Sequence, residues 1–192
     1  MSILVRPATD TDCPQIAAIY RHYVEHTVAT FDTVAPALGA WQEKVAAIAA
    51  AGRPFLVAVK RDDNDQRTDN DQRTDNDQRT DCDQIAGFAY LGAFRTMPAY
   101  DRTSEDTIYV RPGLGGTGIG SALMTRLLAD AAGSDVRQII AVIAATGGAA
   151  SIALHLKHGF THAGQLRAVG RKAGQWIDTV YLQYSVGDPG LG

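Results

Sequence analysis

The amino-acid sequence alternates between stretches with the apolar period of a helix and stretches with that of a strand. A strand is expected over residues 2–8, after which Asp12 and Pro14 fit the N-cap and the first turn of a helix. The apolar positions that follow recur at the spacing of one helix face: Ile16, Ile19, Tyr20, Tyr23 and Val24. This pattern predicts an amphipathic first helix that packs on a sheet.

The same criteria predict alternating elements along the rest of the chain. Further helices are expected at residues 41–51, at 123–131 with an end at Gly133, and around 151–158. Further strands are expected at residues 54–60, 84–94, 106–111, 137–144, 160–169 and 176–185. Helices fall between strands near both ends, whereas the middle is a hairpin. We therefore predict an α/β protein of the α+β type with a mixed sheet, not a purely parallel doubly wound one.

A tandem repeat interrupts this pattern between the two strands of the central hairpin. The hexamer DNDQRT occurs at residues 63–68, 69–74 and 75–80, and DCDQ begins a degraded fourth copy. None of its residues can anchor a core, so we expect a solvated, disordered loop. An insertion at a hairpin tip adds little loop-closure entropy. The chain, residues 1–192, is thus predicted to be one domain with a low-complexity insertion at about 61–83.

Composition excludes several classes of protein. The chain is 45% hydrophobic, which is enough to build a core and argues against a wholly disordered protein. No run approaches the roughly 18 apolar residues of a membrane-spanning helix. The first residues lack the pattern of a secretory signal, so we expect a cytoplasmic protein. Cys13 and Cys82 fit neither a disulfide framework nor a zinc site, and no metal is expected at His22 and His26, which lack a third ligand.

Charge argues against a nucleic-acid partner. The formal net charge is −3, but residues 61–83 alone hold nine Asp and four Arg, so the rest of the chain is only slightly basic. That balance is too small for a nucleic-acid footprint. It is compatible with a local loop that binds an anion.

A glycine-rich turn offers such a loop. The stretch TIYVRPGLGGTGIGSALM leads from a predicted strand into a predicted helix, and its glycines are Gly113, Gly115, Gly116, Gly118 and Gly120. Backbone N–H groups can converge there at a helix N-terminus, which forms a nest for a phosphate or pyrophosphate. A dinucleotide fingerprint lacks its acidic residue after the next strand, and a P-loop lacks its lysine. A coenzyme A pyrophosphate loop and a merely flexible turn also remain open.

The order of several motifs resembles one enzyme superfamily. IYVRPGLGGTGIGSALM resembles the acetyl-CoA loop of the GNAT N-acetyltransferases, and GAASIALHLKHGF is similar to their second hallmark, the pantetheine-side helix and following strand. IYRHYVEHTVATFDT, FRTMPAYDRTSEDTIYV and GQWIDTVYLQ are similar to the phosphinothricin and methionine sulfoximine acetyltransferases. The resemblance implies the GNAT fold, a mixed, mostly antiparallel sheet flanked by helices, and a homodimer.

The resemblance also implies a reaction and a set of residues. The family transfers acetyl directly from acetyl-CoA to a primary amine in a ternary complex. Glu105, placed just before the strand that leads to the loop, corresponds to the general base acting through a water. His155 shares a helix face with Ser151 and corresponds to a proton donor for the CoA sulfur or a group that helps bind the oxyanion. The implied cofactor-binding positions are Ile108, Tyr109, Val110, Gly115, Gly116, Thr117, Gly118, Ile119, Gly120, Ser121, Gly148 and Ser151.

The implied substrate is a small amino-acid-like amine of the phosphinothricin and methionine sulfoximine or sulfone class. The corresponding substrate-binding positions are Phe31, Arg95, Tyr100 and Arg102, where arginine can hold a carboxylate or phosphinate by paired hydrogen bonds. Three positions depart from the family: Met97 replaces an arginine, Gly115 a glutamine or arginine, and Gly148 an asparagine. The departures at Gly115 and Gly148 keep open a CoA-binding module without turnover, and the glycine fingerprint separately keeps open an NAD-dependent oxidoreductase.

Overall fold

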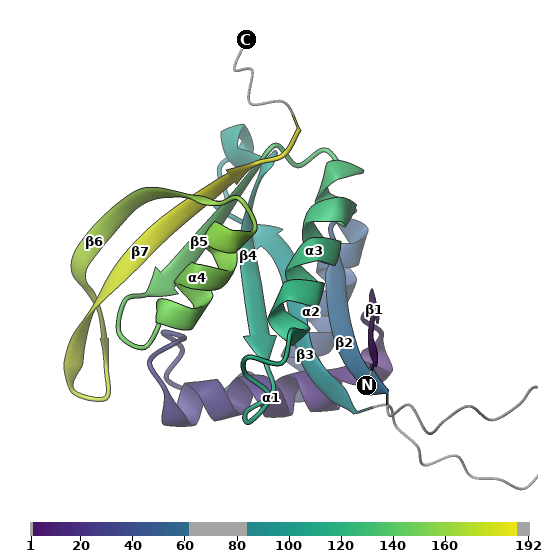
Figure 1. Cartoon of the computed structure of the whole chain (residues 1–192), viewed down its shortest axis with the longest axis horizontal. Helices are drawn as coiled ribbons and strands as arrows, with labels where there is room; N and C mark the ends of the chain where they lie inside the picture. The colour runs from purple at the N-terminus through teal and green to yellow at the C-terminus, as the bar shows by residue number, and fades with distance from the viewer. Residues whose placement is uncertain (1, 62–83, 188–192) are drawn as a thin grey trace, which may run out of the picture.

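A mixed seven-stranded sheet organises the protein, with strand order β1-β2-β3-β4-β5-β7-β6. The computed structural model describes residues 2–61 and 84–187. The strands are β1 (Ser2–Pro7), β2 (Phe55–Arg61), β3 (Ile85–Ala93), β4 (Thr103–Val110), β5 (Gln138–Ala144), β6 (Thr161–Lys172) and β7 (Gln175–Ser185). All neighbours pair antiparallel except β4 and β5, which confirms the predicted mixed sheet (Figure 1). Apart from Arg61, the predicted insertion lies outside the described residues.

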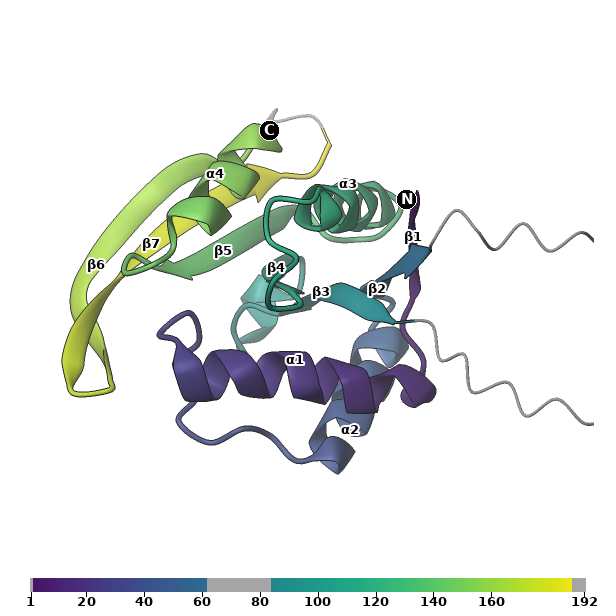
Figure 2. The same ribbon diagram turned by 60° about the horizontal axis from the view of Figure 1, so that its bottom comes forward.

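Helices cover both faces of the sheet. Figure 2 shows α1 (Cys13–His26) and α2 (Leu38–Ala50) on one face, and α3 (Ile119–Ala132) and α4 (Ala149–Lys157) on the other. Two apolar cores result, one beneath each helix pair. Their largest fully buried side chains include Trp41, Phe88, Leu123, Leu127 and Ile139, each of which adds about 1.5–3 kcal/mol of hydrophobic stabilisation. Within the described residues, each helix is too short or too polar to cross a bilayer.

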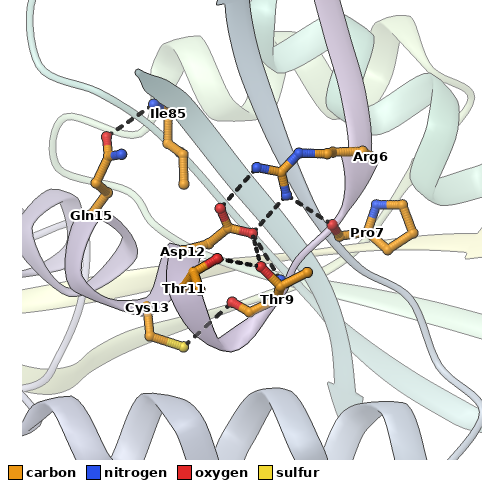
Figure 3. A network of polar contacts seen from close by, with 8 residues as sticks. All are labelled: Arg6, Pro7, Thr9, Thr11, Asp12, Cys13, Gln15 and Ile85. Carbon is orange, nitrogen blue, oxygen red and sulfur yellow. Dashed lines mark hydrogen bonds and ion pairs between the residues drawn. The ribbon is translucent and has the colours of Figure 1, made fainter. Parts of the chain in front are cut away.

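The start of α1 is fixed to the sheet by a polar network (Figure 3). The Asp12 carboxylate accepts hydrogen bonds from Arg6 at 2.7 and 2.9 Å and from the Thr9 backbone N–H at 2.8 Å. Burial alone would raise the pKa of Asp12, but these hydrogen bonds outweigh burial and lower it. Asp12 is the N-cap residue of α1, as the sequence predicts, but its side chain makes no capping hydrogen bond and instead joins β1 to a short 3-10 turn, Asp10–Asp12.

The central strands separate soon after they meet. β4 and β5 pair only from Thr103↔Gln138 to Glu105↔Ile140. Beyond this point β5 continues along β7, while β4 continues along β3. The remaining half of β4 therefore has no strand beside the edge that faces β5.

The predicted boundary of β4 is wrong at its start. The sequence places Glu105 just before a strand over residues 106–111, whereas β4 begins at Thr103 and contains Glu105. Strand pairing explains the difference, because Glu105 lies opposite Gly92 on β3 and Ile140 on β5. The polar residues at the start of β4 adopt the strand conformation because they pair with β3 and β5, and not because of their own strand propensity.

Candidate active site

A cavity of about 940 Å³ lies where β4 and β5 separate. Its walls are formed by the second half of β4, the end of β5, the glycine loop, α4 and the segment between α1 and α2. The predicted site residues that line it are Phe31, Glu105, Ile108, Tyr109, Val110, Gly115, Gly116, Gly118, Gly120, Ser121, Gly148, Ser151 and His155. Most of the residues singled out in the sequence thus meet in one place.

The glycine loop forms one end of this cavity and leads into α3. Gly118 is the N-cap of α3 and adopts φ 88°, a left-handed conformation that favours glycine. A Cβ on Gly115 or Gly116 would meet nothing within 4 Å, so the backbone is open to an approaching group. Together with the positive end of the helix, this loop is suited to an anion.

Two predicted cofactor positions do not line the cavity. The Thr117 hydroxyl donates to the Leu114 carbonyl at 2.7 Å and so closes the loop on itself. Ile119 is 2% exposed and belongs to the core between α3 and the sheet. Both residues stabilise the loop from the side that faces away from the cavity.

A cation that the sequence analysis did not single out lies at the same end. Lys157 of α4 lines the cavity, and its Nζ donates to Ser121 Oγ at 3.4 Å. Ser121 also lies 2.8 Å from His158 Nε2. Burial and the charges of Lys157 and His155 lower the pKa of His158, so the positive charge here belongs to Lys157. These residues come together only because α4 packs against α3, and no local sequence motif predicts this contact.

Gly148 marks a position with no room for a side chain. A Cβ there would lie 2.1 Å from the Ala144 carbonyl oxygen and 2.8 Å from Ile143 Cγ2. The chain turns from β5 into α4 at this point, and Gly148 is the N-cap of α4. An asparagine would therefore require a different backbone path.

His155 is buried in the cavity wall and paired with a carboxylate of β4. Its Nε2 lies 2.9 Å from Asp106 Oδ2, and its Nδ1 lies 2.7 Å from the Ser151 carbonyl oxygen. Ser151 Oγ is more distant, 3.5 Å from Nδ1. Asp106 was not predicted, because an acidic residue beside Glu105 shows no pattern of its own in the sequence.

Glu105 lies in the part of β4 that still pairs with β5, at the edge of the cavity. Burial and the charge of Asp106 raise the pKa of Glu105, and the positive charge of Arg95 partly opposes them. Because successive strand residues face opposite sides, Glu105 and Asp106 point to different faces of the sheet. A carboxyl with a raised pKa beside a cavity is suited to accept a proton near neutral pH.

The segment between α1 and α2 closes the other end of the cavity. Phe31 packs on Gly170 of β6 so closely that a Cβ there would lie 2.3 Å from Phe31 Cε2. Lys172 Nζ donates to the Thr30 carbonyl at 2.8 Å, which fixes the same segment to the β6–β7 hairpin. Tyr20 donates to Asp32 Oδ2 at 2.8 Å and lies 2.6 Å from Thr30 Oγ1. These contacts join residues far apart in the chain, so no local pattern in the sequence indicates them.

Three predicted substrate residues lie outside the cavity wall. The Arg95 guanidinium lies over the Phe94 ring at 4.3 Å, and the Tyr100 ring meets the edge of the same ring at 5.6 Å. The Arg102 carbonyl accepts hydrogen bonds from the backbone N–H groups of Arg137 and Gln138. All three lie on the exposed β3–β4 connection, from which Arg95 acts on Glu105 through its charge.

Comparison with known proteins identifies the family. The family model described as "Acetyltransferase (GNAT) family" matches residues 38–160. A phosphinothricin N-acetyltransferase of Alcaligenes faecalis is 37% identical over 93% of this chain and 80% of its own. An L-methionine sulfoximine/L-methionine sulfone acetyltransferase of Pseudomonas paraeruginosa is 31% identical over 98% of this chain and 97% of its own.

A solved structure agrees with the sequence relatives. The phosphinothricin acetyltransferase of Sinorhizobium meliloti, in complex with acetyl-CoA, superimposes with a TM-score of 0.81 at 34% identity and covers 97% of this chain and 90% of its own. The chain therefore belongs to the acetyltransferase (GNAT) family, which confirms the resemblance, the predicted fold and an acyltransferase activity. An NAD-dependent oxidoreductase is not supported by any of these findings.

Proposed function

We propose that this protein is an N-acetyltransferase that uses acetyl-CoA to acetylate a small amino-acid-like amine of the phosphinothricin and methionine sulfoximine or sulfone class. One observation supports it above all others. A strand edge without a partner runs from Glu105 into a glycine loop at the N-terminus of α3. A carboxylate base, an open backbone edge and an anion-binding loop therefore lie in sequence along one cavity.

The residues present fit the pyrophosphate and the pantetheine of acetyl-CoA. The glycine loop offers backbone N–H groups and the dipole of α3 to a pyrophosphate, and Lys157 adds a side-chain charge. The Arg111 backbone N–H donates to Ala86 on the β3 side, so alternation turns the N–H groups of Ile108 and Val110 toward the open edge. The pantetheine amides can pair with such an edge as an added strand does.

Acetyl-CoA supplies an activated acetyl group as a thioester, and the protein must supply proton transfer and charge. We assign Glu105 as the base that removes a proton from the substrate ammonium through a water. The amine nitrogen then bonds to the acetyl carbon, the carbon–sulfur bond breaks, and amide, CoA thiol and one released proton result. We assign His155 to stabilise the negative charge that develops during acetyl transfer, either as a proton donor to the sulfur or as a fixed positive charge.

Substrate recognition is assigned to the end of the cavity near Phe31. Relatives named for phosphinothricin and for methionine sulfoximine and sulfone support an amino-acid-like amine. Arg95 supplies a positive charge close to Glu105 and is the proposed contact for the anionic group of the substrate. Tyr100 and Arg102 are proposed to form the rim beside it.

Thiol release from acetyl-CoA tests the proposal directly. The enzyme is assayed alone and with phosphinothricin, methionine sulfoximine, methionine sulfone and a panel of ordinary amino acids. We expect amine-dependent release that falls by roughly 100-fold or more in Glu105→Gln, as expected on loss of a general base. Acetyl-CoA binding without turnover of any amine would indicate a CoA-binding module instead. Absence of acetyl-CoA binding, measured as thermal stabilisation, would refute the proposal.

We also propose that the protein works as a homodimer through the β6–β7 hairpin. This hairpin exposes Leu166 (47%), Val169 (51%) and Trp176 (65%), an unusual set of apolar side chains for one exposed element. Light scattering is expected to give twice the 20.5 kDa chain mass, and Trp176→Glu should shift the equilibrium toward monomer. A monomeric wild-type protein at micromolar concentration would contradict this proposal.

A further inference from the structure

The His155–Asp106 pair is the most deeply buried ionisable contact of the cavity wall. The two side chains are 2% and 1% exposed, and the contact joins α4 to the middle of β4 across 2.9 Å. Asp106 Oδ1 has no hydrogen-bond partner among the described residues, so the pairing of Asp106 rests on Oδ2 and the imidazole. A buried pair of this kind is costly unless its geometry is well satisfied.

The acceptors around the ring determine which nitrogens hold protons. A backbone carbonyl has no proton to donate, so the contact of 2.7 Å with the Ser151 carbonyl requires a proton on Nδ1. The carboxylate of Asp106 accepts the second proton, on Nε2. A neutral ring with its Nε2 lone pair facing an ionised Asp106 carboxylate would instead place two acceptors 2.9 Å apart.

Asp106 is the charged group whose hydrogen bond and charge favour a second proton on the His155 ring. Lys157 ends the same helix and His158 is its C-cap residue, Glu105 precedes Asp106 on β4, and the β5 strand next to α4 is apolar through residues 139–144. Phe160, just before β6, packs against the imidazole in an edge contact with ring centroids 4.9 Å apart. Burial lowers the pKa of His155, but the hydrogen bond and charge of Asp106, with the Ser151 carbonyl, raise it overall.

We propose that Asp106 is a positioning residue for acetyl transfer, which holds His155 as an imidazolium with both N–H groups bound inside the protein. His155 then acts as a fixed positive charge in the cavity wall and not as a proton donor to sulfur. Such a charge stabilises the negative charge that develops on the thioester during transfer, and it needs no reorganisation at that moment. The kinetic part of this inference rests on the proposed function, whereas the protonation state does not.

Nitrogen NMR of the full-length protein, labelled with ¹⁵N-histidine, tests the protonation state without any turnover. The His155 signals are identified by their loss in His155→Gln. We expect both ring nitrogens to be protonated at pH 7, with deprotonation only at higher pH. A ring with an unprotonated Nε2 at pH 7 would overturn the proposal, whether or not the enzyme acetylates any of the amines tested.

Steady-state kinetics test the positioning role. In Asp106→Asn we expect kcat to fall by roughly tenfold to a hundredfold, with KM for acetyl-CoA little changed. The alkaline limb of the pH profile should also move to lower pH, because the amide cannot hold the imidazolium. Asp130→Asn, which removes the carboxylate of the surface pair with Arg126, is the matched control and should leave both quantities unchanged. Unaltered kcat and pH profile in Asp106→Asn would overturn the proposal.

A double-mutant cycle separates positioning from a general loss of structure. Asp106→Asn is combined with His155→Gln, so that neither partner is left buried and alone. If Asp106 acts through His155, it should add little further loss of kcat once His155 is gone. Losses that multiply would show an independent role for Asp106 and would contradict the inference. Should Asp106→Asn fail to fold, the NMR result on the wild-type protein decides.

Discussion

Two glycines in the cavity wall stand where the family resemblance leads us to expect polar side chains, and their surroundings differ. Gly115 is open, because a Cβ there would have no atom within 4 Å, whereas a Cβ at Gly148 would lie 2.1 Å from the Ala144 carbonyl oxygen. The same kind of sequence departure thus has two physical meanings. At Gly115 a contact is simply missing, and at Gly148 the backbone has taken a path that only glycine allows.

Substitution at these two positions should therefore act in opposite directions. Gly115→Arg is expected to lower KM for acetyl-CoA by about two- to fivefold, the value of an exposed charge pair. Gly148→Asn is expected to destabilise the protein by roughly 1–3 kcal/mol through overpacking, and not to restore a family contact. Thermal unfolding and acetyl-CoA titration measure both effects. A stable Gly148→Asn protein with tighter binding would show that the turn into α4 is flexible.

The charge of Arg95 should be visible in the pH dependence of the reaction. A base acts when deprotonated, so kcat/KM rises with pH through the pKa of Glu105, which burial and Asp106 raise and Arg95 lowers. Removing the positive charge in Arg95→Gln raises that pKa further. The acidic limb should therefore move to higher pH, while Arg126→Gln on the surface of α3 leaves it in place. If the acidic limb of the pH profile does not move in Arg95→Gln, the charge of Arg95 does not influence the pKa of Glu105.

At the scale of elements, the β6–β7 hairpin positions the segment that contains Phe31. Gly170→Ala is expected to displace the Phe31 ring, since a Cβ there would lie 2.3 Å from it. We expect KM for the amine to rise by about tenfold, because small misplacements of positioning groups are costly, with acetyl-CoA binding unchanged. Gly164→Ala in the same strand meets nothing within 4 Å and is the matched control. Equal kinetics for the two variants would exclude this role of the hairpin.

The order of the elements was predictable, but several of their boundaries and contacts were not. Apolar periodicity identified α1 and α3, and the glycine loop with its flanking motifs identified most of the cavity residues between Ile108 and Ser121, although Thr117 and Ile119 lie outside the cavity wall. Periodicity could not show that pairing extends β4 back to Thr103 and brings Glu105 into the strand. Asp106, Lys157 and Gly170 escaped notice for a related reason: each gains its role only from a partner on another element.

At the scale of the whole molecule, the separation of β4 from β5 divides the sheet into two parts. β1 to β4 form one part and β5 to β7 the other, and they pair directly only over residues 103–105 of β4. The backbone of Ile108 and Val110 is left facing a cavity where a continuous sheet would have a neighbour. The N–H groups of Ile108 and Val110 therefore remain for a ligand, whereas the Val110 carbonyl already accepts a hydrogen bond from the Tyr23 hydroxyl at 2.7 Å.

Amide hydrogen exchange should reveal the unpaired N–H groups on this edge of β4. The N–H groups of Ile108 and Val110 are expected to exchange faster than those of Tyr109 and Arg111, which face β3, because an amide without a partner is not protected. Acetyl-CoA should slow Ile108 and Val110 selectively. Uniform protection along β4 before ligand is added would contradict the open edge.

The gap between β4 and β5 interrupts the hydrogen bonding of the sheet, and a ligand can restore it. In the proposed complex, acetyl-CoA lies between β4 and β5 in the place of a missing strand, and its pantetheine pairs with β4 as an added strand does. Binding of acetyl-CoA then completes the sheet between β4 and β5, and its release opens the sheet again.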